Sequence, residues 1–137
     1  MNEFEIMKKK THLSFLYENN GNVSVALIIG GYDIMGPQLY SIHPHGSTDS
    51  LPFISMGSGS LAAMSILENS FNNYLDLNSA LILSKESILA GIYNDMGSGN
   101  CIDLCIILKN SLIFNRNTWS SDNTSRSNKT LNEKFKG

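Results

Sequence analysis

FISMGSGSLAAM (residues 53–64) carries a Gly-Ser-Gly turn, and so does GIYNDMGSGNCIDLC (residues 91–105). In both stretches the turn lies where an extended segment adjoins a helical one. A turn of this composition brings backbone N–H groups and a hydroxyl close to any neighbouring group. The second stretch adds a carboxylate, Asp95, directly before its turn. If the fold brings the two turns together, they form a small polar site.

Hydrophobic patterning outward from these turns predicts strands on both sides of a pair of helices. The run VSVALII at 23–29 suits a strand buried on both faces, and QLYSIH at 38–43 suits its antiparallel partner. The predicted elements are, in chain order, a helix within residues 7–18, strands at 23–29, 38–43 and 51–56, helices at 59–71 and 78–94, and strands at 102–108 and 111–115. Because strands and helices are segregated along the chain, the predicted class is α+β, built from packed layers.

Composition limits the kinds of partner that the chain can have. Its net charge is −2, with eight acidic residues against two lysines over residues 11–115 and a basic excess over 116–137. An acidic body argues against nucleic-acid binding. No apolar run approaches the ~18 residues that span a membrane, so no membrane segment is expected. Residues 117–137 contain few apolar side chains and are expected to form a disordered tail.

Cysteines and histidines give no metal signal. Cys101 and Cys105 are four residues apart on a predicted strand, so they share one side of it, and we expect reduced thiols in the core. Their spacing lacks the paired histidines typical of zinc sites. His43 and His45 follow a predicted strand and are expected at the surface or in an interface rather than on a metal.

Two longer segments that contain the turns resemble proteasome beta subunits. They are GGYDIMGPQLYSIHPHGSTDSLPFISMGSGSLAAM at 30–64 and AGIYNDMGSGNCIDLCII at 90–107. The His-Pro-His-Gly-Ser-Thr-Asp and Ser-Met-Gly-Ser-Gly-Ser-Leu runs are most similar to the trypsin-like (beta type-7) class. The resemblance covers roughly residues 11–116 without gaps. It implies the αββα sandwich of N-terminal-nucleophile hydrolases, here incomplete because the first strands are missing.

The resemblance also implies a chemistry, peptide-bond hydrolysis by an N-terminal threonine whose own α-amino group can act as base. In this sequence the family's supporting residues fall on Ser58, Asp95 and Ser98. A serine hydroxyl can hydrogen-bond the amine and relay a proton, and a carboxylate can orient the hydroxyls. A structural interpretation stands beside this one: Ser58 lies near the start of a helix, and Asp95 can cap backbone groups around Ser98.

The nucleophile and the catalytic lysine are expected to lie upstream of the matching segment. Thr11 falls on the predicted first helix and Thr48 in a loop, so neither can replace the nucleophile. We therefore expect a partial beta-type domain at 11–116, a divergent segment at 1–10 and a tail at 117–137, without catalysis. Two alternatives remain open: a fragment of an active endopeptidase that cleaves after basic residues, and a non-assembling product of a duplicated gene.

The resemblance further implies partners and a location. Proteasome beta subunits assemble with other alpha and beta subunits in heptameric rings of the core particle. They act on polypeptide substrates in the degradation of ubiquitin-tagged proteins, in the cytoplasm and nucleus. No metal or organic cofactor is implied.

Overall fold

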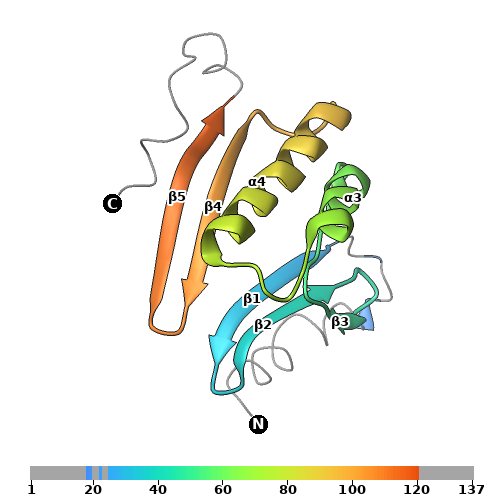
Figure 1. The fold of residues 1–137 in the computed structure, drawn as a ribbon. Helices are drawn as coiled ribbons and strands as arrows, with labels where there is room; N and C mark the ends of the chain where they lie inside the picture. The colour runs from blue at the N-terminus through green and yellow to red at the C-terminus, as the bar shows by residue number, and fades with distance from the viewer. Residues whose placement is uncertain (1–17, 20–21, 23–24, 121–137) are drawn as a thin grey trace.

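Along the described part of the chain, three strands precede a pair of helices and two strands follow it. The computed structural model describes Glu18, Asn19, Asn22 and residues 25–120. In this range the elements are β1 (Leu27–Asp33), β2 (Gly36–Ile42), β3 (Thr48–Ser50), α3 (Ser60–Ser70), α4 (Leu77–Asn94), β4 (Cys101–Leu108) and β5 (Ser111–Ser120) (Figure 1). The predicted order of three strands, two helices and two strands is confirmed. The predicted helix within 7–18 lies almost wholly outside the described residues.

The first sheet has the order β1-β2-β3, and both of its pairings are antiparallel. The predicted hairpin between β1 and β2 is therefore confirmed, but its first strand is placed differently. The predicted strand at 23–29 ends before Gly30, but β1 continues through Gly30 and Gly31 to Asp33, and the loop is only Ile34-Met35. The chain can turn in two residues because Asp33 Oδ1 accepts a hydrogen bond from the N–H of Met35 at 2.7 Å and Gly36 adopts a φ of +110°.

The prediction that this strand is buried on both faces is wrong. Burial alternates along β1, and Ile28 keeps 45% of its surface exposed. An unbroken apolar run therefore does not reveal whether both faces of a strand are covered, because that depends on the neighbouring layers.

The predicted third strand at 51–56 is also wrong. The strand that pairs with β2 is β3, three residues earlier, in the register Ser41↔Asp49. Residues 51–56 cross to α3 without strand structure. Pro52 interrupts this segment, and a proline has no N–H to offer a strand ladder.

The second sheet is the β4–β5 hairpin, whose turn at Lys109-Asn110 is as predicted. β5 runs to Ser120, five residues past the predicted end at Asn115, so residues 117–120 of the expected tail belong to this strand, where Trp119 and Ser120 pair with Ile102 and Cys101. The register shifts between Ile102 and Leu104, where Asn117 adopts a φ of +51°. The remainder of the expected tail, residues 121–137, lies outside the described residues.

The two predicted helices are confirmed as α3 and α4, which pack against each other, and α4 also contacts β4 (Figure 1). Asp76 begins α4 by accepting a hydrogen bond from the N–H of Ser79 at 2.9 Å. The buried apolar core of the described residues is small and is contributed by β2, α3, α4 and β4. It comprises Ile42, Ala63, Leu67, Leu83, Ile102 and Leu104.

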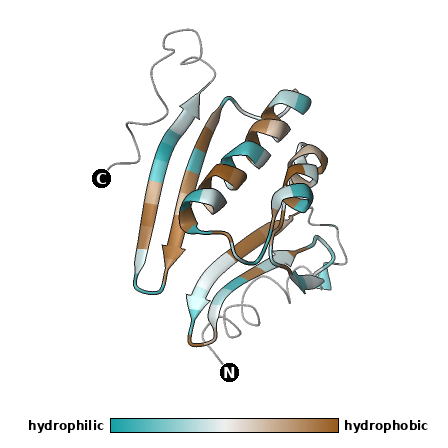
Figure 2. Cartoon of the chain, in the orientation of Figure 1, coloured by the Kyte–Doolittle hydropathy of each residue, from teal (hydrophilic) through white to brown (hydrophobic). Residues whose placement is uncertain are grey.

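One face of the β4–β5 hairpin is apolar and exposed. Figure 2 shows hydrophobic residues along nearly all of β4. Leu112 and Phe114 on β5 stay 56% and 62% exposed. Cys101 and Cys105 are free and exposed on this sheet, so the prediction that they are core thiols is wrong, although they do share one side. No helix among the described residues is long and apolar enough to cross a membrane.

Candidate functional site

The structure brings the two Gly-Ser-Gly turns together on one carboxylate. The Ser58 hydroxyl donates to Asp95 Oδ2 at 2.6 Å, and the Ser98 hydroxyl donates to the same oxygen at 2.6 Å. Ser58 and Asp95 are 37 positions apart in the chain. We call these three residues the Ser58–Asp95–Ser98 cluster. The condition stated for a small polar site, that the fold brings the two turns together, is met by this geometry.

The first turn presents Ser58 at the start of α3. Gly57 adopts a φ of +108°, and its carbonyl accepts a hydrogen bond from the N–H of Ser60, so the chain reverses directly into the helix. The N-cap residue is Gly59, and no side chain caps the helix. The structural interpretation, which places Ser58 near the start of the helix, agrees with Gly59 as the N-cap residue, but the Ser58 hydroxyl donates to Asp95 and not to the helix.

The second turn begins where α4 ends. Asp95 is the C-cap residue of α4, and its N–H donates to the carbonyl of Gly91 at 2.9 Å. The N–H of Ser98 donates to the backbone carbonyl of Asp95 at 3.1 Å, which closes the turn. The helix end thus fixes the backbone of Asp95, and the turn returns Ser98 to its carboxylate.

Hydrogen bonds keep Asp95 ionised. The Ser58 hydroxyl, and after it the Ser98 hydroxyl, lower the pKa of Asp95 below its ordinary value, since both donate to the charged form. The backbone N–H groups of Gly97 and Ser98 lower this pKa further, and desolvation opposes them. The interpretation of Asp95 as a backbone cap is thus compatible with its hydroxyl contacts. At neutral pH the cluster is an anion holding two hydroxyls in fixed directions.

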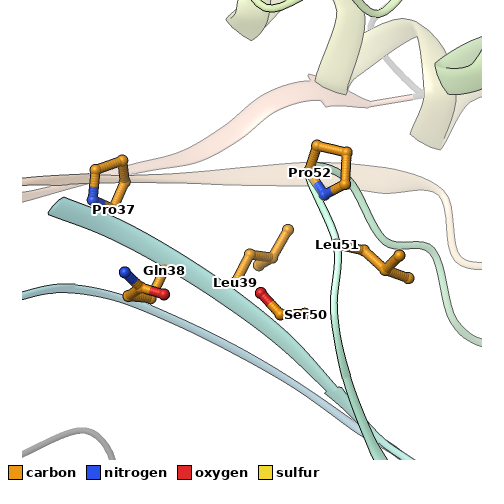
Figure 3. A pocket seen from close by; sticks show the side chains of 6 residues that line it. All are labelled: Pro37, Gln38, Leu39, Ser50, Leu51 and Pro52. Atoms are coloured by element: carbon orange, nitrogen blue, oxygen red, sulfur yellow. The ribbon is translucent and has the colours of Figure 1, made fainter. Parts of the chain in front are cut away.

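A hollow of about 260 Å³ adjoins the cluster. Ser58, Gly59, Ser98 and Gly99 line it from the two turns, while Ile88 and Ile92 of α4 form an apolar wall. A second hollow lies away from the cluster, beside β2 and β3, and is lined by Pro37, Gln38, Leu39, Ser50, Leu51 and Pro52 (Figure 3). Of these two hollows, the first therefore brings polar hydroxyls and an apolar wall to one place.

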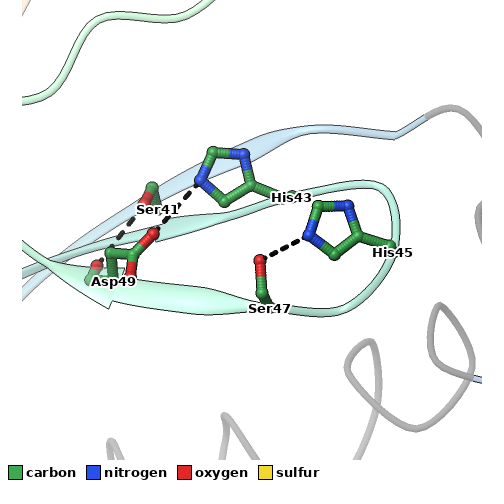
Figure 4. Close-up of polar contacts among 5 residues, drawn as sticks. All are labelled: Ser41, His43, His45, Ser47 and Asp49. Atoms are coloured by element: carbon green, nitrogen blue, oxygen red, sulfur yellow. Dashed lines mark hydrogen bonds and ion pairs between the residues drawn. The ribbon is translucent and has the colours of Figure 1, made fainter.

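The histidines form a separate polar group in the β2–β3 turn. His43 Nε2 lies 3.3 Å from Asp49 Oδ2, and His45 Nε2 lies 2.8 Å from the Ser47 hydroxyl (Figure 4). The two imidazole rings stack with centroids 5.8 Å apart. No group of three metal-ligating side chains occurs within the described part of the chain. Sequence reasoning missed Asp49, which pairs with Ser41, two residues before His43, in the β2–β3 hairpin.

Comparisons with known proteins place the chain in a family. The family model described as "Proteasome subunit" matches residues 4–107. The chain belongs to the proteasome subunit family. Among curated relatives, it is 51% identical over 102 residues to proteasome subunit beta type-7-A of Arabidopsis thaliana, covering 74% of this chain and 37% of that protein.

Two further relatives show how far this similarity extends within proteasome beta subunits. The chain is 47% identical over 102 residues to proteasome subunit beta type-7 of Dictyostelium discoideum, covering 74% of the chain and 38% of the relative. It is 49% identical over 92 residues to proteasome subunit beta type-10 of Rattus norvegicus, covering 67% and 34%. The similarity is therefore to beta-type subunits, with types 7 and 10 matched about equally. The chain spans little more than a third of the length of these relatives.

Proposed function

We propose that this chain is a beta-type subunit polypeptide of the proteasome, in which the Ser58–Asp95–Ser98 cluster supports a threonine peptidase site of the trypsin-like class. One observation carries the proposal: two hydroxyls from separate Gly-Ser-Gly turns converge at 2.6 Å on one carboxylate oxygen. A helix cap or a solvated turn does not require that convergence. An active site that must hold hydroxyls in fixed directions does.

The hydrogen-bond directions define what the cluster can do chemically. A serine hydroxyl has one proton and two lone pairs, and in this cluster both protons are committed to Asp95. The hydroxyl oxygens are therefore left as acceptors. They suit a neighbouring ammonium or hydroxyl donor, such as the α-amino group and side chain of an N-terminal threonine. Because Asp95 is ionised, it also favours a positive charge beside the cluster.

Neither threonine of the described residues lines the hollow beside the cluster. Thr118 Oγ1 donates to the carbonyl of Ile102 at 2.9 Å, and Thr48 lies in β3. Of the two lysines in the described range, Lys85 belongs to α4 and Lys109 to the β4–β5 turn. We propose that the described residues do not hydrolyse peptides by themselves. The threonine and lysine of the site are supplied by polypeptide other than these residues.

Assembly is the second part of the proposal. The chain adopts part of an αββα sandwich and joins other alpha and beta subunits in a heptameric ring, in the cytoplasm and nucleus. The exposed apolar face of the β4–β5 hairpin supports this, since large uncovered apolar surfaces mark contacts with other polypeptide. The relatives' names, which are those of proteasome subunits, support it as well.

The test of assembly is density-gradient sedimentation of the tagged chain from cells that express proteasomes. We expect part of the chain to sediment with the large core particle and to co-purify with its subunits through a second affinity tag. A profile containing only free or aggregated chain would contradict the proposal.

The test of chemistry is an assay with a fluorogenic peptide ending in arginine. The purified chain, cleared of endogenous proteasome, is expected to release no fluorophore. If hydrolysis occurs, Asp95→Asn must abolish it and Ser65→Ala must not, because the Ser65 hydroxyl bonds only its own helix, at Ala62 O. Hydrolysis with that pattern would support the alternative of an active endopeptidase.

A further inference from the structure

Two glycines face each other where the start of α3 crosses the last turn of α4. These helices lie side by side in Figure 1. A Cβ atom placed on Gly59 would lie 3.0 Å from the Ser98 hydroxyl oxygen, 3.1 Å from Gly91 Cα and 3.3 Å from the Gly91 carbonyl oxygen. Side chains do not tolerate contacts this short without movement of one partner. A side chain at Gly59 would therefore displace these neighbours by a few tenths of an ångström.

Each atom that a Cβ at Gly59 would approach too closely belongs to a residue that is hydrogen-bonded to Asp95. The Ser98 hydroxyl oxygen is the one that donates to Asp95 Oδ2 at 2.6 Å. The Gly91 carbonyl accepts the N–H of Asp95 at 2.9 Å, and Gly91 is buried. A side chain at Gly59 can be accommodated either by rotating the Ser98 hydroxyl away or by moving the backbone that holds Asp95. Both adjustments act on the same carboxylate.

We infer that Gly59 is a positioning residue for the Ser58–Asp95–Ser98 cluster, because its missing side chain allows the Ser98 hydroxyl to stay on Asp95. As a statement about catalysis, this inference rests on the proposed function. As a statement about geometry, it stands on the contacts of Gly59 alone. Gly59 then has a second role beside that of N-cap residue of α3.

The neighbouring glycines provide matched controls. A Cβ atom on Gly91 would meet the Gly59 carbonyl oxygen at 3.4 Å, an ordinary contact, although Gly91 faces the same crossing. A Cβ atom on Gly99, in the second turn, would meet nothing within 4 Å. Alanine is therefore expected to be tolerated at both positions, and an effect confined to Gly59→Ala cannot arise merely from losing a glycine.

The experiment is an NMR titration of the Asp95 side-chain carboxyl carbon in the full chain at low temperature. In Gly59→Ala we expect the Asp95 titration midpoint to shift upward from wild type, because a hydroxyl donor to the carboxylate is weakened. In Gly91→Ala and Gly99→Ala we expect the wild-type midpoint. An unchanged midpoint in folded Gly59→Ala would overturn the inference.

A double-variant cycle guards against a purely structural effect. Ser98→Ala alone should raise the midpoint, and adding Gly59→Ala in that background should give no further upward shift. If Gly59→Ala does not fold, Gly59→Ala/Ser98→Ala removes the nearest obstructing atom and should restore folding, as judged by the fluorescence of Trp119. Loss of folding in both backgrounds would overturn the inference, because the obstruction would then not lie at Ser98.

The outcomes distinguish this inference from the proposed function. The titration needs no peptidase activity and no partner, so it can succeed when the chain fails to sediment with proteasomes. Conversely, assembly with an unchanged midpoint in Gly59→Ala would leave the proposed function intact and remove the positioning role of Gly59.

Discussion

At the scale of single residues, one carboxylate oxygen of Asp95 accepts two hydrogen bonds from different parts of the chain. Two hydroxyls donate to Oδ2, one from the turn before α3 and one from the turn after α4. The carboxylate thereby connects two chain segments that share no strand pairing. Any change that neutralises Asp95 should weaken both connections together, because each depends on the same charge.

This coupling predicts a pH-dependent stability. Since its folded-state pKa lies below the ordinary value of about 3.9, Asp95 contributes stability above the unfolded pKa, and this is lost as pH falls through the folded pKa. Ser58→Ala removes the largest cause of the lowering. Its urea midpoint should therefore be below that of wild type at pH 7, and the gap should shrink when the pH falls well below about 4.

Ser65→Ala is the control, because its hydroxyl bonds only the carbonyl of Ala62 within α3. Its effect on the urea midpoint should not vary with pH. A gap between Ser58→Ala and wild type that stays constant across the acid range would contradict the coupling to Asp95.

A second prediction concerns Asn117, which adopts a left-handed φ of +51° where β5 shifts register against β4. Its N–H donates to Asp103 Oδ1 at 2.8 Å, which holds the bend. Asparagine tolerates this conformation, whereas a β-branched residue does not. We expect Asn117→Val to lower the free energy of unfolding by about 1–2 kcal/mol and Asn117→Gly to leave it nearly unchanged, as measured by urea denaturation. Equal effects of the two substitutions would contradict a conformational cause.

Sequence reasoning singled out three residues that the structure brings together but misjudged the cysteines, and the reasons differ. Ser58, Asp95 and Ser98 lie in turns whose glycines limit the backbone, so the motif alone suggests that hydroxyls and a carboxylate meet. The period of two along β4 shows that Cys101 and Cys105 share a side. It does not say which side α4 covers, and the structure puts Ile102 and Leu104 there instead.

At the scale of elements, the helices were easier to predict than the strand boundaries. α3 and α4 have their own limits, a Gly-Ser-Gly turn before one and the Asp76 cap before the other. β1 and β3 are defined by the partner that pairs with them. The β1–β2 ladder extends through Gly30 and Gly31 to the pair Asp33↔Gly36. β3 forms where the turn that follows His43 brings the chain back alongside β2. Pairing of this kind is not encoded in local composition.

The two faces of β4 should respond differently to the same substitution. Ile102 is 1% exposed, whereas Ile107 on the same strand is 42% exposed. Removing one methylene from a buried isoleucine costs about 0.5–1.5 kcal/mol. We expect Ile102→Val to lower the free energy of unfolding by that amount and Ile107→Val to change it by less than half as much, measured by urea denaturation. Equal losses at the two positions would mean that the outer face is covered in solution.

At the scale of the whole molecule, the described residues bury little and expose much. Large apolar side chains stay uncovered on the β4–β5 hairpin and at the β1–β2 turn, where Ile34 is 92% exposed. Each such side chain left in water forgoes about 1.5–3 kcal/mol, and a domain has only about 5–15 kcal/mol of stability in total. The isolated chain is therefore expected to be only marginally stable, and contacts with other polypeptides are expected to raise its stability.

We accordingly expect the isolated chain to unfold in a broad thermal transition of low enthalpy. Trp119 is the only tryptophan of the chain and packs edge-on to Tyr93 at 6.0 Å, so its fluorescence follows the contact between β5 and α4. Chain recovered from the core particle should keep this signal at temperatures where the free chain has lost it, because contacts made only by the folded state raise its stability. Phe114→Thr should reduce aggregation of the free chain with little loss of stability, since that ring is already 62% exposed. A sharp, reversible melt of the free chain, with equal calorimetric and van't Hoff enthalpies, would instead show that these residues form a self-sufficient domain.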